Sequence, residues 1–192
     1  MNIYQRLDRI MPRILEKRFR ENKGLGNEIG FYIFDYDPKD ELLVREHISF
    51  IKQKINNENS EVQIKEFDLY DIMLEMLEQK GYLDKVMAME SAKGSEKIIN
   101  PIKKTLRLTQ KNDLMVEYIK KNVSPNDIVF ITGVGKAWPI IRSHTVLNNL
   151  HSVIDEVPVV MFFPGRYDGQ ELRLFEEFKD DNYYRAFKLV ER

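Results

Sequence analysis

Cysteine is absent from the 192 residues, and its absence excludes two classes of small protein. Without cysteine there is neither a disulfide framework nor a cysteine-ligated zinc site. Histidine is also scarce, with three residues, and no spacing of histidines or carboxylates matches a metal site. The sequence therefore predicts no metal and no cofactor.

Long hydrophobic runs are missing as well. No segment reaches the roughly 20 consecutive apolar residues of a membrane-spanning helix, and residues 1–20 lack the apolar stretch of a signal peptide. The formal net charge of -1 disfavours a dedicated nucleic-acid or membrane-surface protein. We therefore expect a soluble, cytoplasmic protein with no membrane partner.

Hydrophobic strand-like runs alternate with helix-like segments along most of the chain. Strands are predicted at 30–36, 62–67, 127–132, 156–165 and 183–190, and helices at 40–55, 69–80 and about 139–151. Strands separated by helices are typical of a mainly parallel sheet covered on both faces. Because 43% of the residues are hydrophobic, residues 1–192 are expected to form a single α/β domain, a three-layer sandwich.

The segment from about 82 to 122 does not follow this alternation. It is helical throughout by its pattern, with interruptions at Gly94-Ser95 and Lys111-Asn112. Pro101 is expected in the first turn of one of these helices, where its missing N–H has no cost. We interpret the segment as a helical insertion in the domain.

Residues 1–22 are predicted to form a basic amphipathic helix, kinked or started late by Pro12. Its apolar stripe recurs at helical spacing and consists of Ile3, Leu7, Ile10 and Ile14. Residues 1–20 contain six basic and two acidic side chains. Two interpretations stay open. The arm binds a partner through Leu7, Ile10, Arg13 and Ile14, or it covers its own domain.

The stretch GVGK follows the strand at 127–132 and resembles the end of a phosphate-binding loop. That loop requires G-x-x-x-x-G-K-[ST], but Phe130 occupies the place of the first glycine and Ala137 that of the hydroxyl residue. The domain is therefore expected to resemble a nucleotide-hydrolase core without a functional phosphate loop. Gly133, Gly135 and Lys136 form either a weak anion site or a tight strand-to-helix turn.

Polar side chains follow several of the predicted strands. In open α/β sheets the loops at the carboxyl ends of the strands form the working edge. A ligand site there would use Asp35, Asp37, Gly133, Gly135, Lys136 and His144. The alternatives are that Asp35 and Asp37 satisfy backbone donors and cap a helix, and that His144 is structural.

The segment 164–173 is read as a loop rich in side chains that are common in interfaces. It contains Arg166, Tyr167, Asp168, Gln170 and Arg173 beside two glycines. Exposed arginine and tyrosine frequently anchor protein contacts. The segment is expected either to bind a partner or to form an ordered cover over the edge of the sheet.

Four long collinear segments resemble the BrxB family of the bacterial BREX (bacteriophage exclusion) phage-defence systems. They are NKGLGNEIGFYIFDYDPKDELLVREH, FITGVGKAWPIIRSHTVLNNL, FFPGRYDGQELRLF and DDNYYRAFKLV. The resemblance spans about Lys23 to Val190. It implies a small required subunit without established catalytic residues, acting beside a PglZ-like protein and a BrxC-like ATPase and meeting DNA only indirectly.

Three functional hypotheses follow. The first is a non-catalytic adaptor that tethers the PglZ-like and BrxC-like components through the basic arm and the 164–173 loop. The second is a nucleotide- or metal-binding sensor or enzyme at the carboxyl edge. The third, direct DNA binding through the arm, is disfavoured by the near-zero net charge.

Overall fold

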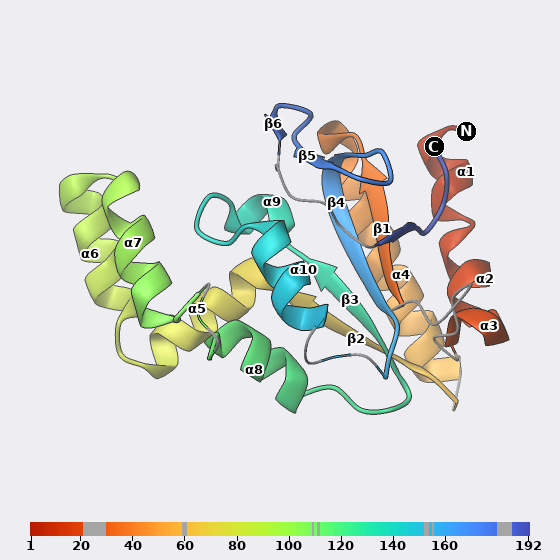
Figure 1. The fold of residues 1–192 in the computed structure, drawn as a ribbon, viewed down its shortest axis with the longest axis horizontal. Coiled ribbons are helices and arrows are strands. Elements are labelled where there is room, and N and C mark those ends of the chain that lie inside the picture. The colour runs from red at the N-terminus through yellow and green to blue at the C-terminus, as the bar shows by residue number, and fades with distance from the viewer. Residues whose placement is uncertain are drawn as a thin grey trace.

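The computed structural model describes residues 1–20, 30–58, 61–108, 110, 112–151, 154, 156–179 and 186–192. Its centre is a parallel sheet in the order β2-β3-β4-β1-β7 (Figure 1). The strands are β1 (Phe31–Tyr36), β2 (Gln63–Asp68), β3 (Asp127–Thr132), β4 (Val159–Tyr167) and β7 (Phe187–Lys188). The predicted α/β class with a mainly parallel sheet is confirmed.

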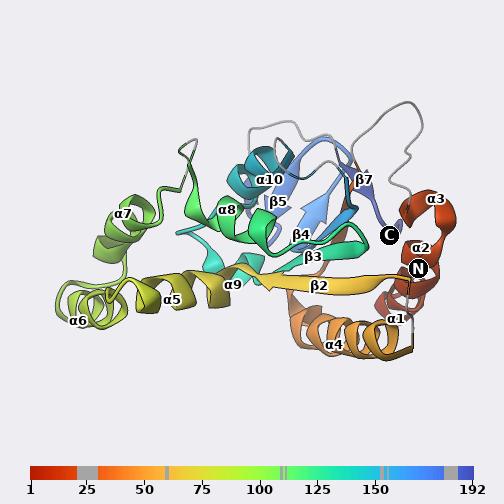
Figure 2. The same ribbon diagram turned by 90° about the horizontal axis from the view of Figure 1, so that it is seen from below.

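Helices cover both faces of the sheet because its strands alternate apolar side chains to either side. On β1, Phe31 and Ile33 join one hydrophobic cluster, and Tyr32 and Phe34 join the other. Figure 2 shows the helices above and below the sheet. One layer contains α1 (Ile3–Leu7), α2 (Ile10–Leu15), α3 (Lys17–Arg20) and α4 (Glu41–Glu58); the other contains α5 (Leu69–Gln79), α8 (Leu114–Lys121), α9 (Val134–Ala137) and α10 (Ser143–His151).

The outer edge of β2 is partly closed by a side chain of α4. The amide nitrogen of Asn56 donates to the carbonyl of Ile64 at 3.1 Å, and the Ile64 N–H donates to Asn56 Oδ1 at 2.6 Å. Unpaired backbone groups on an edge strand invite pairing with another chain. Asn56 therefore blocks strand addition at this point of the sheet.

Helices α6 (Leu83–Lys93) and α7 (Glu96–Thr105) project from the end of α5, on the left in Figures 1 and 2. No residue of α6 is buried, whereas α7 buries Ile98 and Ile102. Pro101 lies inside α7 and not in a first turn, so that prediction is wrong. The helix tolerates it although its ring nitrogen has no N–H to donate within the helix. That 82–122 is an insertion stays a prediction.

The segment predicted as a loop at 164–173 is a β-hairpin. Strand β4 continues to Tyr167 and pairs antiparallel with β5 (Leu172–Leu174), which pairs in turn with β6 (Phe178–Lys179). The helix expected from about Pro139 begins only at Ser143. Of the strand predicted at 183–190, residues 183–185 lie outside the described residues.

Candidate functional site at the carboxyl edge of the sheet

Asp35 lies near the end of β1 with 2% of its surface exposed, and it holds both ends of the chain. Its Oδ1 accepts a hydrogen bond from Arg6 Nη2 at 3.0 Å. Its Oδ2 accepts from the Tyr167 N–H at 3.1 Å and lies 3.1 Å from Arg192 Nε. Both carboxylate oxygens are therefore occupied by internal partners, and neither is presented to a ligand.

Arg6 fills the other half of this contact, and we call Arg6, Asp35 and Arg192 the terminal clamp. The guanidinium also donates to the carbonyls of Asp35 at 2.7 Å, Val190 at 3.1 Å and Glu191 at 3.2 Å. Burial lowers the pKa of Arg6, and the nearby carboxylate of Asp35 offsets part of this effect. A buried ion pair needs such full hydrogen bonding because both charges lose their water.

Asp37 acts as a helix cap. Its Oδ1 accepts from the Lys39 N–H at 3.1 Å, and its Oδ2 lies 2.7 Å from Lys39 Nζ. These hydrogen bonds from Lys39 lower the pKa of the Asp37 carboxyl. Among the described residues no three His, Cys, Asp or Glu side chains gather as metal ligands would. Capping, one of the two interpretations of Asp37, describes its contacts.

The GVGK turn closes onto the first turn of α5. Gly133 has a φ of 71°, and a Cβ on it would lie 2.2 Å from Asp68 Oδ1. That oxygen accepts from the N–H groups of Tyr70 at 3.0 Å and Asp71 at 3.1 Å. A glycine is therefore required both by the left-handed backbone and by the close approach of Asp68.

Lys136 pairs with the same carboxylates. Its Nζ lies 2.7 Å from Asp68 Oδ2 and 3.2 Å from Asp71 Oδ1. Burial would lower the pKa of Lys136, but the hydrogen bonds to Asp68 and Asp71 outweigh it and raise that pKa. The charge that a phosphate would need is thus neutralised within the protein. The likeness to a nucleotide-hydrolase core stays a prediction.

His144 belongs to a different part of the surface. It lines a cavity of about 230 Å³ together with Lys103, Asp113 and Arg142, and this cavity is not lined by Asp35, Asp37 or Lys136. Burial, and then the nearby Arg142, lower the pKa of Lys103. The residues predicted to form one ligand edge are therefore divided among separate local contacts.

The hairpin of β4, β5 and β6 carries basic residues in cross-strand register. Arg166 is directly opposite Arg173, and Arg173 is directly opposite Lys179. All three side chains are exposed. We call them the cationic row. Among the described residues, neither Arg166 nor Arg173 has a side-chain hydrogen bond or ion pair.

Tyr167 and Asp168, the other contact residues predicted in this segment, support the hairpin. The Tyr167 hydroxyl donates to the carbonyl of Ala186 at 2.7 Å, and its side chain is buried. Asp168 Oδ1 accepts from the N–H groups of Gln170 at 2.9 Å and Glu171 at 2.8 Å. These backbone donors lower the pKa of Asp168.

An aromatic cluster beside the cationic row was missed by the sequence reasoning. The rings of Trp138 and Phe178 lie 4.4 Å apart, and Phe175 contacts both. Phe178 is 43% exposed. The single tryptophan directly after GVGK and the phenylalanines of FEEF were the available signals, but nothing in the sequence shows that the two segments meet.

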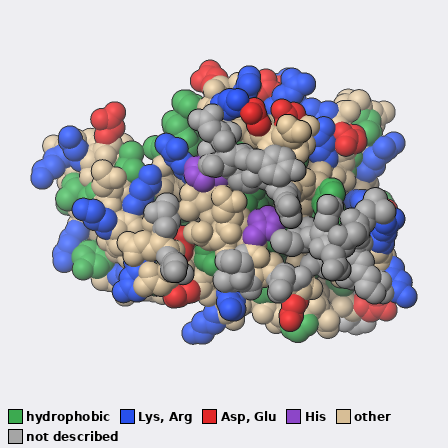
Figure 3. Space-filling view, in the orientation of Figure 1, with side chains coloured by type: hydrophobic (Ala, Val, Ile, Leu, Met, Phe, Trp, Pro, Cys, Tyr) green, Lys and Arg blue, Asp and Glu red, His purple; other side chains and the backbone are tan. Residues whose placement is uncertain are grey.

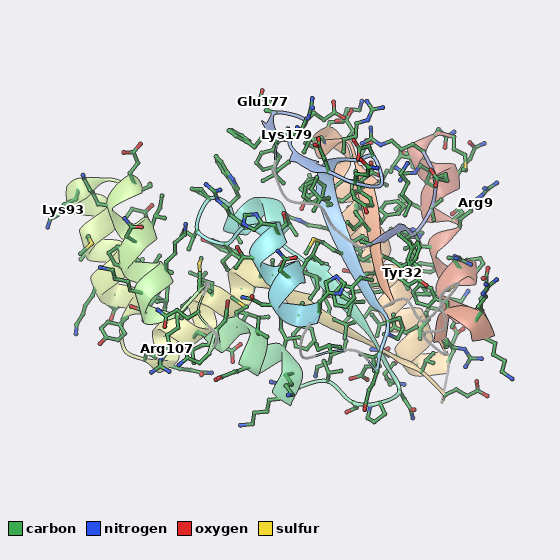
Figure 4. The ribbon with its side chains drawn as sticks, in the orientation of Figure 1. Arg9, Tyr32, Lys93, Arg107, Glu177 and Lys179 are labelled. Atoms are coloured by element: carbon green, nitrogen blue, oxygen red, sulfur yellow. The ribbon has the colours of Figure 1, made fainter. Side chains whose placement is uncertain are left out.

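A cavity of about 250 Å³ opens beside this cluster. Its lining includes Trp138, Phe178, Arg142, Lys179 and Glu177. Figure 4 places Glu177 and Lys179 at the β6 end of the hairpin, and Figure 3 shows basic and acidic side chains gathered there, at the top of the view. Aromatic and charged groups therefore meet on one exposed part of the molecule.

The stripe of the N-terminal arm faces the sheet. Leu7, Ile10 and Ile14 are buried in the cluster that contains Tyr32 and Phe34. Arg13 stays partly exposed and pairs with Glu16 on the arm. Residues 21 and 22 lie outside the described part. The apolar side chains cannot meet a partner while the arm is in place, so binding through the arm stays a prediction.

The comparisons with known proteins give the family. A family model described as BREX protein BrxB matches residues 65–189. A BREX protein BrxB of Bacillus cereus (strain H3081.97) is 64% identical over 190 residues, covering 99% of this chain and 98% of that protein. One of Escherichia coli O9:H4 (strain HS) is 36% identical over 187 residues, covering 96% and 90%.

No solved structure matches the chain. None of the helices in the described residues has the length and apolar character to cross a bilayer. The resemblance inferred from the sequence is confirmed, because both relatives cover nearly all of the chain. The chain belongs to the BrxB family of BREX proteins.

Proposed function

We propose that this BrxB-family chain is a non-catalytic adaptor of the BREX phage-defence system. It tethers other BREX components, the PglZ-like protein and the BrxC-like ATPase, and contacts DNA only through them. Family membership supports a role in the BREX phage-defence system. The adaptor role and the two partners are the parts that experiment has to test.

The polar groups of the carboxyl edge support an adaptor more than an enzyme. Asp35 is held by two arginines, and Asp68 is held by Lys136 and two backbone N–H groups. A general base or a nucleophile needs a side chain that can reach its substrate. Asp35 and Asp68 instead use their carboxylates to position helices and the chain ends.

The observation that carries the proposal is the pair of arginines on β4 and β5. Arg166 and Arg173 are exposed and directly opposite each other, and neither has an internal acidic partner among the described residues. Like charges directly opposite on a sheet are destabilising. Arginine is also enriched among the residues that dominate protein interfaces. A partner surface accounts for both facts.

The test is copurification with each BREX component in turn. We expect the PglZ-like or the BrxC-like component to bind the unchanged protein, and Arg166→Ala/Arg173→Ala to lose that component. Lys120→Ala/Lys121→Ala, on the exposed end of α8, is the matched control and should bind normally. The proposal is wrong if the unchanged protein binds no component.

The binding of residues 1–22 to a partner is better tested by substituting exposed residues of the arm than by deleting the arm. Deletion would expose the sheet beneath Leu7, Ile10 and Ile14 and remove Arg6 from the terminal clamp. Arg9→Ala/Arg18→Ala changes exposed arginines of the arm and leaves its buried stripe intact. Loss of a component in this variant would place a contact on the arm.

A second candidate function is anion or nucleotide sensing, for which the cavity beside His144 is the relevant feature. Lys103 and Arg142 both line it, and within the described part of the chain neither forms an ion pair with a carboxylate, although Asp113 also lies on the wall. Calorimetry with phosphate and ATP tests it. Saturable binding that disappears in Lys103→Ala/Arg142→Ala would favour a sensor.

A further inference from the structure

We propose that the β4–β5–β6 hairpin binds an acidic, extended segment of a protein partner that also carries an apolar side chain. The carboxylates of this segment would lie along the cationic row. The apolar side chain would enter the cavity that Trp138 and Phe178 help to line. The inference rests on the adaptor role and names the chemistry of the partner.

The register of the cationic row determines which ligand fits it. Directly opposite residues on an antiparallel sheet have Cβ atoms about 5 Å apart and share one face. Arg166, Arg173 and Lys179 therefore form a line across three strands. Arginine binds carboxylate through two parallel hydrogen bonds. Carboxylates placed between these side chains would replace their mutual repulsion by attraction.

The neighbouring cavity supplies an apolar anchor point. The rings of Trp138 and Phe178 are tilted by 32° with their centres 4.4 Å apart, and both residues line the cavity of about 250 Å³. Buried aromatic side chains provide much of the affinity of protein interfaces. Phe178 is directly opposite Leu174, so it lies on the other face of the hairpin from Arg173 and Lys179. Because Lys179 also lines the cavity, a segment that crosses the edge strand β6 can reach both features.

The turn that joins β5 to β6 orders the aromatic residues before a partner binds. Phe175 and Glu176 have φ values of 53° and 63°, a region that residues other than glycine seldom adopt. Phe175 packs against Trp138, and a Cβ on Gly135 would lie 3.0 Å from its ring. A surface ordered before binding loses less entropy when it binds.

The surrounding charges favour a protein over a nucleic acid. Residues 164–179 contain three basic and four acidic side chains. Glu177 lines the cavity, and Glu171 lies 2.9 Å from Lys179. A nucleic-acid strand carries a negative charge at every phosphate, so it would meet these carboxylates. A short acidic segment can place its charges at the cationic row alone.

The test uses overlapping short peptides that tile the PglZ-like and BrxC-like components, with fluorescence anisotropy as the readout. We expect the tightest binders to contain acidic residues next to a large apolar residue. Arg166→Glu/Arg173→Glu should weaken them by about 30-fold, the loss typical of a hot-spot arginine. Lys120→Glu/Lys121→Glu should bind them as the unchanged protein does.

Charge exchange and a DNA competitor complete the experiment. Peptides whose acidic residues are replaced by lysine should bind the Arg166→Glu/Arg173→Glu variant again. Thermal unfolding of both variants shows whether they remain folded. Tightest binding of neutral or basic peptides, or binding of a single-stranded oligonucleotide that depends on Arg166 and Arg173, overturns the inference.

The outcome also separates this inference from the adaptor role. If an intact component copurifies but none of its peptides binds, the acidic-segment inference is overturned and the adaptor role stands. If no intact component copurifies with the unchanged protein, the adaptor role itself has failed.

Discussion

The terminal clamp and the cationic row contain the same kind of residue in opposite surroundings. Arg6 is 4% exposed and hydrogen-bonded to Asp35 and to three carbonyl groups. Arg166 and Arg173 are exposed and face each other. A charge removed from water requires a complete set of hydrogen-bonding partners. An exposed charge is hydrated and does not need a partner within the protein. The terminal clamp therefore stabilises the fold, and the arginines of the cationic row are available for binding.

The largest effect on stability is expected from removing the buried arginine of the terminal clamp. Arg6→Ala leaves the carboxylate of Asp35 buried and only partly compensated, which should lower the free energy of unfolding by about 3–5 kcal/mol. Denaturant unfolding measures it. Arg13→Ala, in an exposed pair with Glu16, is the control and should change stability by no more than about 0.5 kcal/mol. Equal effects of the two substitutions would contradict the contrast.

An intermediate effect is expected at Arg192, which contacts Asp35 from a half-exposed position. Its side chain is 36% exposed, and its Nη2 also donates to the carbonyl of Gly165 at 2.6 Å. Arg192→Ala should cost about 1–2 kcal/mol of unfolding free energy, since Asp35 keeps Arg6 and water can reach the gap. A loss of unfolding free energy as large as that of Arg6→Ala would show that the burial of the arginine does not determine its contribution to stability.

A smaller effect of the opposite sign is expected in the cationic row. Arg173→Glu places a carboxylate between Arg166 and Lys179 and should raise the free energy of unfolding by about 0.2–1 kcal/mol. The same substitution should weaken partner binding, because it removes a cation and adds a repelling charge. Thermal unfolding and copurification measure the two quantities. A variant that binds normally would show that the row is not a contact surface.

The smallest effect concerns pH and Asp168, which supports the hairpin. Backbone hydrogen bonds lower its pKa below the ordinary value of 3.8, so its carboxylate stabilises the fold above that value. This contribution is lost as the pH falls through the lowered pKa. Unfolding curves of the unchanged protein and Asp168→Ala should therefore differ at neutral pH and converge in acid. A constant difference at all pH values would contradict this origin.

Local patterns were sufficient for the sheet and most of its helices. Strand β3 and the first part of β4 are continuous apolar runs, and such runs are buried on both faces of a parallel sheet. The sequence predicts a loop where the hairpin lies, because strands β5 and β6 are short and their pattern is interrupted by charged residues. Their pairing depends on contacts with β4, which a local pattern does not contain.

The α/β class, the absence of a complete phosphate-loop motif and the family can all be read from the chain alone, since each depends on residues close together or on collinear similarity. The roles of the charged residues depend on how the chain folds in three dimensions. Arg6 and Arg192 stand at opposite ends of the chain, yet both contact Asp35. Arg166, Arg173 and Lys179 share a face only because of strand register. Burial and register arise from distant contacts, and they determine whether a charge stabilises the fold or is presented to a partner.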